Sequence, residues 1–183
     1  MTNYAETYLQ YLEKLVGRRE DHIKPIESTR PGLPIVYVLF FHDWPCKNVL
    51  TSFTLGIAMG KHIEEVGGHI ECVVSLDTND FSWGLAVAFL AEQARDQALL
   101  SYGSTLNMGE QISRESQMSA FILSAPHQWS GTTHFHHGRR VVTLLEAHPI
   151  YASELEYAAQ ICRHEIAQKV QGACYDVHRQ SFV

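Results

Sequence analysis

Residues 35–41 form an uninterrupted apolar run, IVYVLFF, that is rich in β-branched and aromatic side chains. A run of this length and composition predicts a β-strand that is buried on both faces. Such a strand needs a sheet around it and helices packed on the buried faces of that sheet. The run therefore predicts a layered protein in which helices cover a sheet.

Four further segments have the composition of strands and are bounded by glycine, proline or polar residues. They are residues 51–57, 70–76, 118–123 and 141–145. The connections between them allow hairpins, which join antiparallel neighbours. We therefore expect all five strands to lie in one sheet.

Three other segments repeat apolar residues at helical spacing. They are residues 3–16, 80–98 and 153–170. Gly17 is expected to end the first helix and Asp80 to cap the second. Ser153 and Glu156 fit the capping-box pattern at the start of the third helix. The expected fold class is α+β, with a central mixed, largely antiparallel β-sheet covered by helices.

The chain has 183 residues, which is enough to bury the core of one domain. Residues 1–17 predict an N-terminal helix. Residues 18–34 are polar and contain three prolines, so they predict a connecting loop. We expect a single domain over residues 1–183.

The charge of the chain limits its classes of partner. It has 14 Lys and Arg against 20 Asp and Glu, a formal net charge of −6. A sequence-independent grip on nucleic acid needs clustered positive charge, so we expect no nucleic-acid partner. No apolar run is long enough to span a bilayer, and the N-terminus lacks the basic start and apolar middle of a signal peptide. We expect a cytoplasmic protein without a membrane partner.

The cysteines are Cys46, Cys72, Cys162 and Cys174, and no two of them form a Cys-x-x-Cys pair. Dispersed cysteines in apolar surroundings are usually reduced core residues. The sequence therefore predicts no disulfide framework.

Three of the eleven histidines lie in THFHHG, residues 133–138. In an extended segment His134 and His136 would point the same way and His137 the other way. Two side chains could then chelate a metal, and a third ligand would have to come from elsewhere. The other interpretation is a solvated loop from residue 127 to about residue 140. A metal-dependent hydrolase that uses His134, His136 and one distant ligand stays open as the alternative function.

No complete catalytic motif supports an enzyme. The sequence contains no His-Glu-x-x-His helix, no Gly-x-Ser-x-Gly elbow, no phosphate-binding Gly-Lys-Ser/Thr loop and no Gly-x-Gly-x-x-Gly after a strand. We therefore expect no catalytic residues, no metal and no cofactor.

Two tryptophans are expected to have different roles. Trp83 lies on the apolar stripe of the second helix, so we expect it in the core. Trp129 lies in a polar loop. A large aromatic side chain in a loop is either tucked under that loop or available to a partner, because such residues anchor interfaces.

Several segments, read in order, resemble the suppressor of fused domain family. They are TLGIA at 54–58, ECVV at 71–74, FILSAP at 121–126, HPIY at 148–151 and DVHRQS at 176–181. Two positions depart from the family pattern. Ala58 replaces the usual serine, and the segment 102–105 lacks the histidine of the family's Gly-His-Thr. The resemblance covers residues 35–181, which would form the family-like core of a compact, bacterial-type member.

The resemblance implies a protein that binds another protein and is not an enzyme. Animal members of the family sequester a transcription factor, and bacterial members are proposed to be immunity proteins that neutralise a cognate toxin. In the animal relatives the partner peptide lies near the loop that matches residues 125–129. We therefore expect a protein that binds a toxin, with partner contacts at Pro126, His127, Trp129, His134 and Phe135. The resemblance does not specify an oligomeric state.

Overall fold

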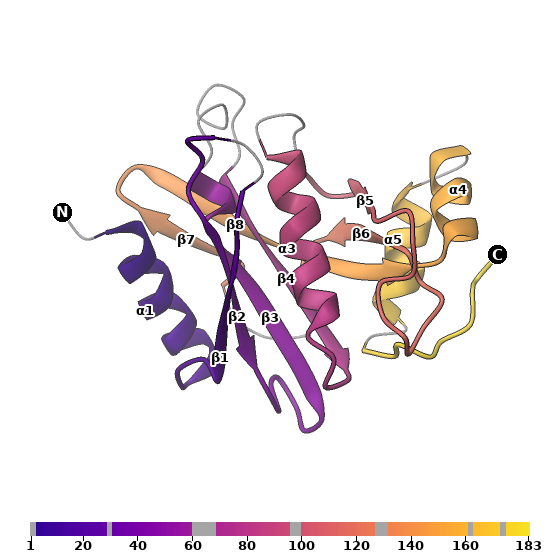
Figure 1. Cartoon of the computed structure of the whole chain (residues 1–183), viewed down its shortest axis with the longest axis horizontal. Helices are drawn as coiled ribbons and strands as arrows, with labels where there is room; N and C mark the ends of the chain where they lie inside the picture. The colour runs from indigo at the N-terminus through magenta and orange to yellow at the C-terminus, as the bar shows by residue number, and fades with distance from the viewer. Residues whose placement is uncertain are drawn as a thin grey trace.

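The computed structural model describes residues 3–28, 31–59, 69–95, 100–126, 132–160, 163–172 and 175–183. Figure 1 shows a twisted sheet with helices on both of its faces. The strands are β1 His22–Ile26, β2 Val36–Phe41, β3 Val49–Leu55, β4 His69–Asp77, β5 Thr105–Asn107, β6 Ala120–Ser124, β7 His134–His137 and β8 Arg140–Ile150. The helices are α1 Tyr4–Val16, α3 Ser82–Ala94, α4 Ala152–Gln160 and α5 Arg163–Gly172, with a 3-10 turn at Ile57–Met59.

All eight strands belong to one sheet in the order β1-β2-β3-β4-β8-β6-β5, and β7 pairs with β8 beside this path. Only the β4–β8 pair is parallel among the described strands. The predicted fold class is therefore confirmed. The five strands predicted from the sequence do share one sheet.

Helices cover the sheet unequally. Helix α3 packs on one face, where Trp83 is 1% exposed and its ring lies edge-on to Phe121. Helix α1 covers one end of the opposite face with Tyr4, Tyr8 and Leu12. Helices α4 and α5 pack on β6 and β8 at the other end of the sheet (Figure 1). The prediction that Trp83 is a core residue is confirmed.

Helix α3 approaches the sheet closely at Gly84. A Cβ atom at this position would lie 2.3 Å from Ser52 Oγ and 2.8 Å from the ring of Phe40. We expect Gly84→Ala to lower the free energy of unfolding by about 1–3 kcal/mol, because the added methyl group overpacks a buried contact. Denaturant unfolding measures this cost. The double variant Gly84→Ala/Ser52→Gly should recover part of it, and a double variant no more stable than Gly84→Ala would contradict the steric explanation.

The prediction of a loop over residues 18–34 is wrong in part, because β1 lies within this segment. It pairs antiparallel with β2 at the edge of the sheet, and Pro25 lies opposite Tyr37. Four of its five residues are exposed, so the strand shows no alternation of apolar and polar residues. Proline is tolerated in edge strands, where its missing N–H costs no ladder bond.

The predicted loop over residues 127–140 is also wrong in part, because β7 pairs with β8 across a two-residue turn. The turn has Gly138 at φ 63° and Arg139 outside the positive-φ region. Glycine at the first central position suits a type II′ hairpin. Two further strands differ from prediction: β5 forms where no strand was predicted, and β8 continues beyond the predicted end at residue 145, through Pro149.

The predicted helix over residues 153–170 is two helices, α4 and α5. The predicted cap is displaced as well. Ser153 lies inside α4 and its hydroxyl contacts Ser181 Oγ at 3.1 Å, while Glu154 accepts the backbone N–H of Tyr151 at 2.9 Å. The predicted end of the first helix at Gly17 is confirmed, with φ 84° and an N–H bond to the Glu13 carbonyl.

The start of the second helix lies close to its prediction. The residue before α3 is Phe81, and the Asp80 carboxylate accepts the N–H of Ser82 at 2.9 Å. The expectation of buried cysteines holds for Cys72 but not for Cys46, which is exposed. Cys46 lies in the turn between β2 and β3, where no layer covers it. Cys162 and Cys174 lie outside the described residues.

Candidate partner-binding surface

Strands β6 and β7 form one interrupted strand along the same side of β8. Ser124 lies opposite Glu146, and the Thr133 carbonyl accepts a hydrogen bond from the Leu144 N–H at 2.7 Å. Both pairings lie on the side of β8 that faces away from β4. The eight-residue connection 125–132, of which 127–131 lie outside the described residues, therefore joins two paired segments that are separated on β8 by a single residue, Leu145.

The alternation along β7 separates its two faces. Phe135 is 5% exposed and its ring stacks on those of Tyr8 and Tyr11 at 4.9 and 5.1 Å. His134 and His136 are exposed on the opposite face, and their ring centroids are 6.0 Å apart. The prediction that these two histidines point the same way is confirmed.

His137 is on the α1 side of β7, as predicted. Its Nδ1 atom lies 3.2 Å from Thr7 Oγ1, and its ring meets Tyr4 edge-on at 5.5 Å. Tyr11 also donates a hydrogen bond to the Thr132 carbonyl. Helix α1 thus holds one face of β7 through three ring contacts at Phe135 and one at His137, together with polar contacts to His137 and to Thr132, which precedes the strand. The other face of β7 is exposed.

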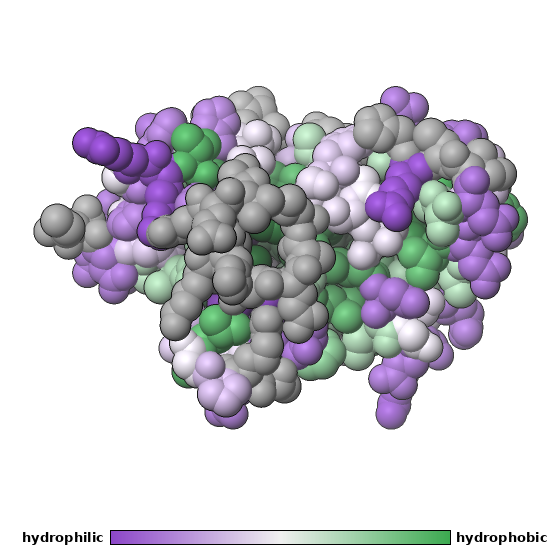
Figure 2. All heavy atoms as spheres, turned by 90° about the horizontal axis from the view of Figure 1, so that it is seen from above, coloured by the Kyte–Doolittle hydropathy of each residue, from purple (hydrophilic) through white to green (hydrophobic). Residues whose placement is uncertain are grey.

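The five residues predicted to contact a partner fall into three groups. His134 is exposed on β7, and Pro126 is half-buried just after the end of β6. Phe135 belongs to the core that α1 covers, so its side chain does not lie on the exposed face of β7. His127 and Trp129 lie outside the described residues. In Figure 2, hydrophilic side chains dominate the end of the molecule formed by α1 and β7.

A serine, a histidine and a glutamate meet elsewhere on the sheet, and their geometry is not that of a catalytic triad. His148 Nε2 lies 2.8 Å from Ser124 Oγ and 3.8 Å from Glu146 Oε2. A triad needs the nucleophile and the carboxylate on opposite ring nitrogens. Here the same nitrogen faces both groups, so the ring cannot relay a proton between them.

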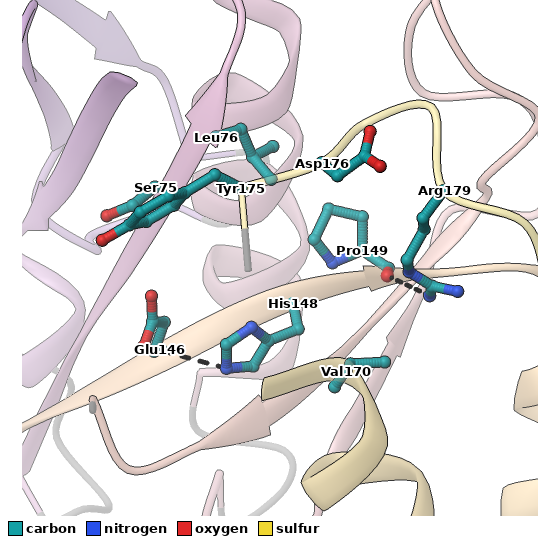
Figure 3. Close-up of a pocket in the computed structure, with 9 residues that line it drawn as sticks. All are labelled: Ser75, Leu76, Glu146, His148, Pro149, Val170, Tyr175, Asp176 and Arg179. Carbon is teal, nitrogen blue, oxygen red and sulfur yellow. Dashed lines mark hydrogen bonds and ion pairs between the residues drawn. The ribbon is translucent and has the colours of Figure 1, made fainter. Parts of the chain in front are cut away.

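The cavity beside this cluster is small. It holds about 20 Å³ and is lined by residues from β4, β8, α5 and the C-terminal segment (Figure 3). That volume fits about one water molecule, not a substrate. Across the parts of the chain that the structure describes, no three His, Cys, Asp or Glu side chains are grouped as metal ligands. None of the described helices is long and apolar enough to cross a membrane.

A buried carboxylate, Glu71 on β4, holds the sheet to α1 and to the end of β3. Its Oε1 accepts hydrogen bonds from Tyr4 Oη at 2.7 Å, from the Gly56 N–H at 2.8 Å and from the Ala58 N–H at 3.2 Å. Its Oε2 accepts one from Thr54 Oγ1 at 2.6 Å. Burial raises the pKa of Glu71, and these hydrogen bonds oppose that rise. The TLGIA and ECVV segments of the sequence therefore meet at one carboxylate.

A second buried carboxylate, Glu154 on α4, fixes the C-terminal segment. Arg179 forms a bidentate pair with it, with N–O distances of 2.6 and 2.7 Å, and also donates to the Pro149 carbonyl at 2.8 Å (Figure 3). Glu154 further accepts the N–H groups of Tyr151 and Phe182 at 2.9 Å each. The guanidinium lies 4.6 Å from the centroid of the Phe182 ring.

The β7–β8 hairpin and the role of Glu71 were not predicted from the sequence, and only the hairpin has a recognisable sequence signal. The alternation H-F-H-H, a Gly-Arg turn and R-V-V-T is typical of a hairpin. The role of Glu71 had no such signal, because a single glutamate in an apolar strand does not reveal which donors will surround it. The charge of a buried glutamate indicates only that some hydrogen-bond donor or positive charge must lie beside it.

Comparison with known proteins agrees with this architecture. Residues 34–179 match the family model of the suppressor of fused protein, SUFU. No curated protein matches the chain. A SUFU homolog from Neisseria gonorrhoeae has a similar fold, with a TM-score of 0.72, 20% identity, and coverage of 98% of this chain and 97% of that chain.

Two further solved structures are similar in fold at low identity. One chain of the Sufu–Fu complex has a TM-score of 0.68 and 10% identity, with 97% of this chain and 91% of that chain covered. Drosophila Suppressor of Fused has a TM-score of 0.65 and 9% identity, with 90% of this chain and 46% of that chain covered. The family model spans most of the sequence, including both buried carboxylates, and the chain therefore belongs to the suppressor of fused protein (SUFU) family.

Proposed function

We propose that this chain is a non-catalytic protein-binding domain that acts in the cytoplasm and holds a cognate toxin in an inactive complex. Membership of the SUFU family supports protein binding, and one structure of similar fold was solved as the Sufu–Fu complex. The Ser124, His148 and Glu146 geometry supports a function without catalysis. A toxin as the partner is supported by the resemblance of the sequence to bacterial members of the family.

The observation that carries the proposal is that β8 holds both ends of the connection formed by residues 125–132. Its two ends are fixed by backbone pairing to β8, and its neighbour β7 is braced by α1. A loop on a rigid scaffold is the usual position of a binding site. Pro126, His127 and Trp129 lie within this connection, and His134 follows it. Phe135 is buried in the core that α1 covers.

We expect Trp129→Ala to weaken binding of the partner about thirtyfold or more. Truncating an aromatic anchor of an interface costs at least about 2 kcal/mol. The candidate partner is the toxin encoded next to the gene for this chain, and titration calorimetry measures the affinity of the purified pair. Phe89→Ala is the matched control, because it truncates an exposed aromatic residue on α3, far from β7.

The two variants together separate folding from binding. Both should melt within about 2 °C of the unchanged protein, because surface substitutions alter stability by about 0.5 kcal/mol or less. Equal affinities for the two variants would contradict the role of the loop. A neighbouring toxin that shows no binding and no loss of activity with the unchanged protein would contradict the proposed function itself.

A metal-dependent hydrolase is the second candidate, favoured only by the shared orientation of His134 and His136. Two imidazoles leave a third protein ligand to be supplied. Metal analysis of the purified protein decides between the candidates. Zinc at one equivalent that resists dialysis would favour the hydrolase.

A further inference from the structure

We infer that a cavity beside the start of α1 binds a phosphate group, which His69, His137 and Arg140 hold. The cavity has a volume of about 120 Å³ and is lined by these three residues together with Tyr4, Ala58, Met59 and Val142. It lies on the face of the sheet that α1 covers, whereas the exposed histidines of β7 lie on the other face. The inference is independent of the proposed function, because it concerns a small anion and not a protein partner.

The register of three strands brings the cationic side chains together. His69 pairs with Val142 across the parallel β4–β8 ladder, and His137 pairs with Arg140 across the β7–β8 hairpin. Alternate residues of a strand lie on the same face, so Arg140 shares a face of β8 with Val142, which packs in the core that α1 covers. The turn between β7 and β8 lies beside the first turn of α1, which begins at Tyr4 (Figure 1).

The neighbours of both histidines decide which ring nitrogen carries the hydrogen. His69 Nδ1 lies 3.1 Å from the carbonyl oxygen of Ala58, which can only accept, so this Nδ1 is the donor. Thr7 Oγ1 donates its hydrogen to the Asn3 carbonyl at 3.2 Å, so it accepts one from His137 Nδ1, which is 3.2 Å away. Neither Nε2 atom has a hydrogen-bond partner within the described part of the chain.

Protonation gives each of these rings a second donor. Histidine side chains gain a proton between about pH 8 and pH 5, and an imidazolium ring donates from both nitrogens. Because each Nδ1–H already has an acceptor, the added N–H at Nε2 needs one, which a ligand in the cavity can provide. Arg140 adds a permanent positive charge. Imidazolium and guanidinium groups both donate charge-assisted hydrogen bonds to phosphate oxygens.

The lining of the cavity carries no negative charge among the described residues. Two carboxylates contact residues around it, and both are engaged. Glu71 is buried and accepts hydrogen bonds from Tyr4 Oη at 2.7 Å and from the Ala58 N–H at 3.2 Å, while Glu6 accepts the Asn3 N–H at 3.3 Å. Burial raises the pKa of Tyr4, so its hydroxyl group stays neutral. An anion in the cavity therefore meets cationic and neutral groups.

The rest of the lining is apolar and limits the size of the ligand. Ala58, Met59 and Val142 form this part. One water molecule needs about 10–15 Å³ of such space, so the cavity admits a group of several heavy atoms. Free phosphate would use the cationic groups alone, whereas a small organic phosphate would also place its apolar part against the apolar residues.

Calorimetric titration of the purified protein at pH 6 with phenyl phosphate and with inorganic phosphate tests the site. We expect phenyl phosphate to bind saturably with a Kd below about 1 mM, and inorganic phosphate to bind about tenfold more weakly, because only phenyl phosphate buries apolar surface. Equal or tighter binding of inorganic phosphate would identify free phosphate as the ligand. If neither compound bound saturably, the inference would be wrong.

Two matched pairs of variants locate the binding. Arg140→Gln should weaken binding of phenyl phosphate about tenfold, the loss of one charge-assisted hydrogen bond, and Arg139→Gln should not, because Arg139 lies in the turn and does not line the cavity. His137→Asn should weaken binding and His136→Asn should not. The asparagine at 137 keeps an N–H group for Thr7, and thermal unfolding checks that all four variants fold. Equal weakening within either pair would overturn the inference.

The pH dependence tests the histidines separately from the arginine. Between pH 6 and pH 8 histidine side chains lose their proton, whereas a phosphate monoester, whose second pKa is about 6, becomes more negative. A site held by Arg140 alone would therefore bind more tightly at pH 8. We expect the opposite, a fall of about tenfold in affinity for phenyl phosphate, as each lost N–H donor costs about that much. This fall should disappear in His69→Gln/His137→Asn, and a rise in affinity with pH in the unchanged protein would contradict the assignment.

Discussion

Glu71→Ala is expected to lower the free energy of unfolding by about 4 kcal/mol. The carboxylate is fully buried and accepts the N–H groups of Gly56 and Ala58 together with the hydroxyl groups of Tyr4 and Thr54. Alanine leaves these donors buried without an acceptor, and each such group costs about 1–3 kcal/mol. For a chain of this size the midpoint of thermal unfolding should fall by about 8–16 °C.

Two milder variants make the Glu71 prediction a graded series. Tyr4→Phe removes one of the donors and should cost about 1 kcal/mol. Glu71→Gln keeps the shape but replaces one acceptor oxygen by a donor, so its cost should fall between the other two. Calorimetry measures all three midpoints. A ranking in which Glu71→Gln is as stable as the unchanged protein would show that the donors do not depend on the carboxylate.

Glu154→Ala is expected to cost about 3–5 kcal/mol, because it leaves the Arg179 guanidinium buried without its counter-charge. The same change orphans the N–H groups of Tyr151 and Phe182. We therefore expect the C-terminal segment, residues 175–183, to detach before the rest of the chain unfolds. Limited proteolysis should then cut this segment at a rate that the unchanged protein does not show.

The charge of Arg179 explains most of this cost, and a double variant tests that explanation. Removing both partners of a buried ion pair destabilises less than the sum of the two single changes. The variant Glu154→Ala/Arg179→Met should therefore be more stable than Glu154→Ala alone. If the double variant loses the full sum, the contribution of Glu154 comes from its backbone contacts and not from the ion pair.

The periodicity of the sequence predicted the interior of the sheet well. Strands β2, β4 and β6 were predicted because most of their side chains are buried, on both faces of the sheet, and such strands are largely apolar. Helix α1 was found because it buries one stripe. In each case the same burial that stabilises the element requires apolar residues at regular spacing, and this spacing can be recognised in the sequence.

Strands β1 and β7 were not predicted, because strands at the margins of a sheet bury few apolar side chains. β1 has four exposed residues and a proline, and β7 has three polar residues around Phe135. Their positions come from pairing with β2 and β8, which is a property of the assembled sheet. The candidate surface was found only in part for the same reason: the sequence located the histidines and the loop, and the structure shows which face of β7 is covered by α1.

Under the proposed function, the interruption between β6 and β7 would let this fold change what it recognises without changing how it folds. Both ends of the eight-residue connection are held in register by β8, so the two ends stay together whatever the connection contains. Doubling the length of a flexible loop costs only about 0.6 kcal/mol in closure entropy. Insertions and substitutions in residues 125–132 should therefore accumulate quickly between relatives, while the strands on either side change slowly. Under the proposed function, a change of partner would then alter this connection and leave the core as it is.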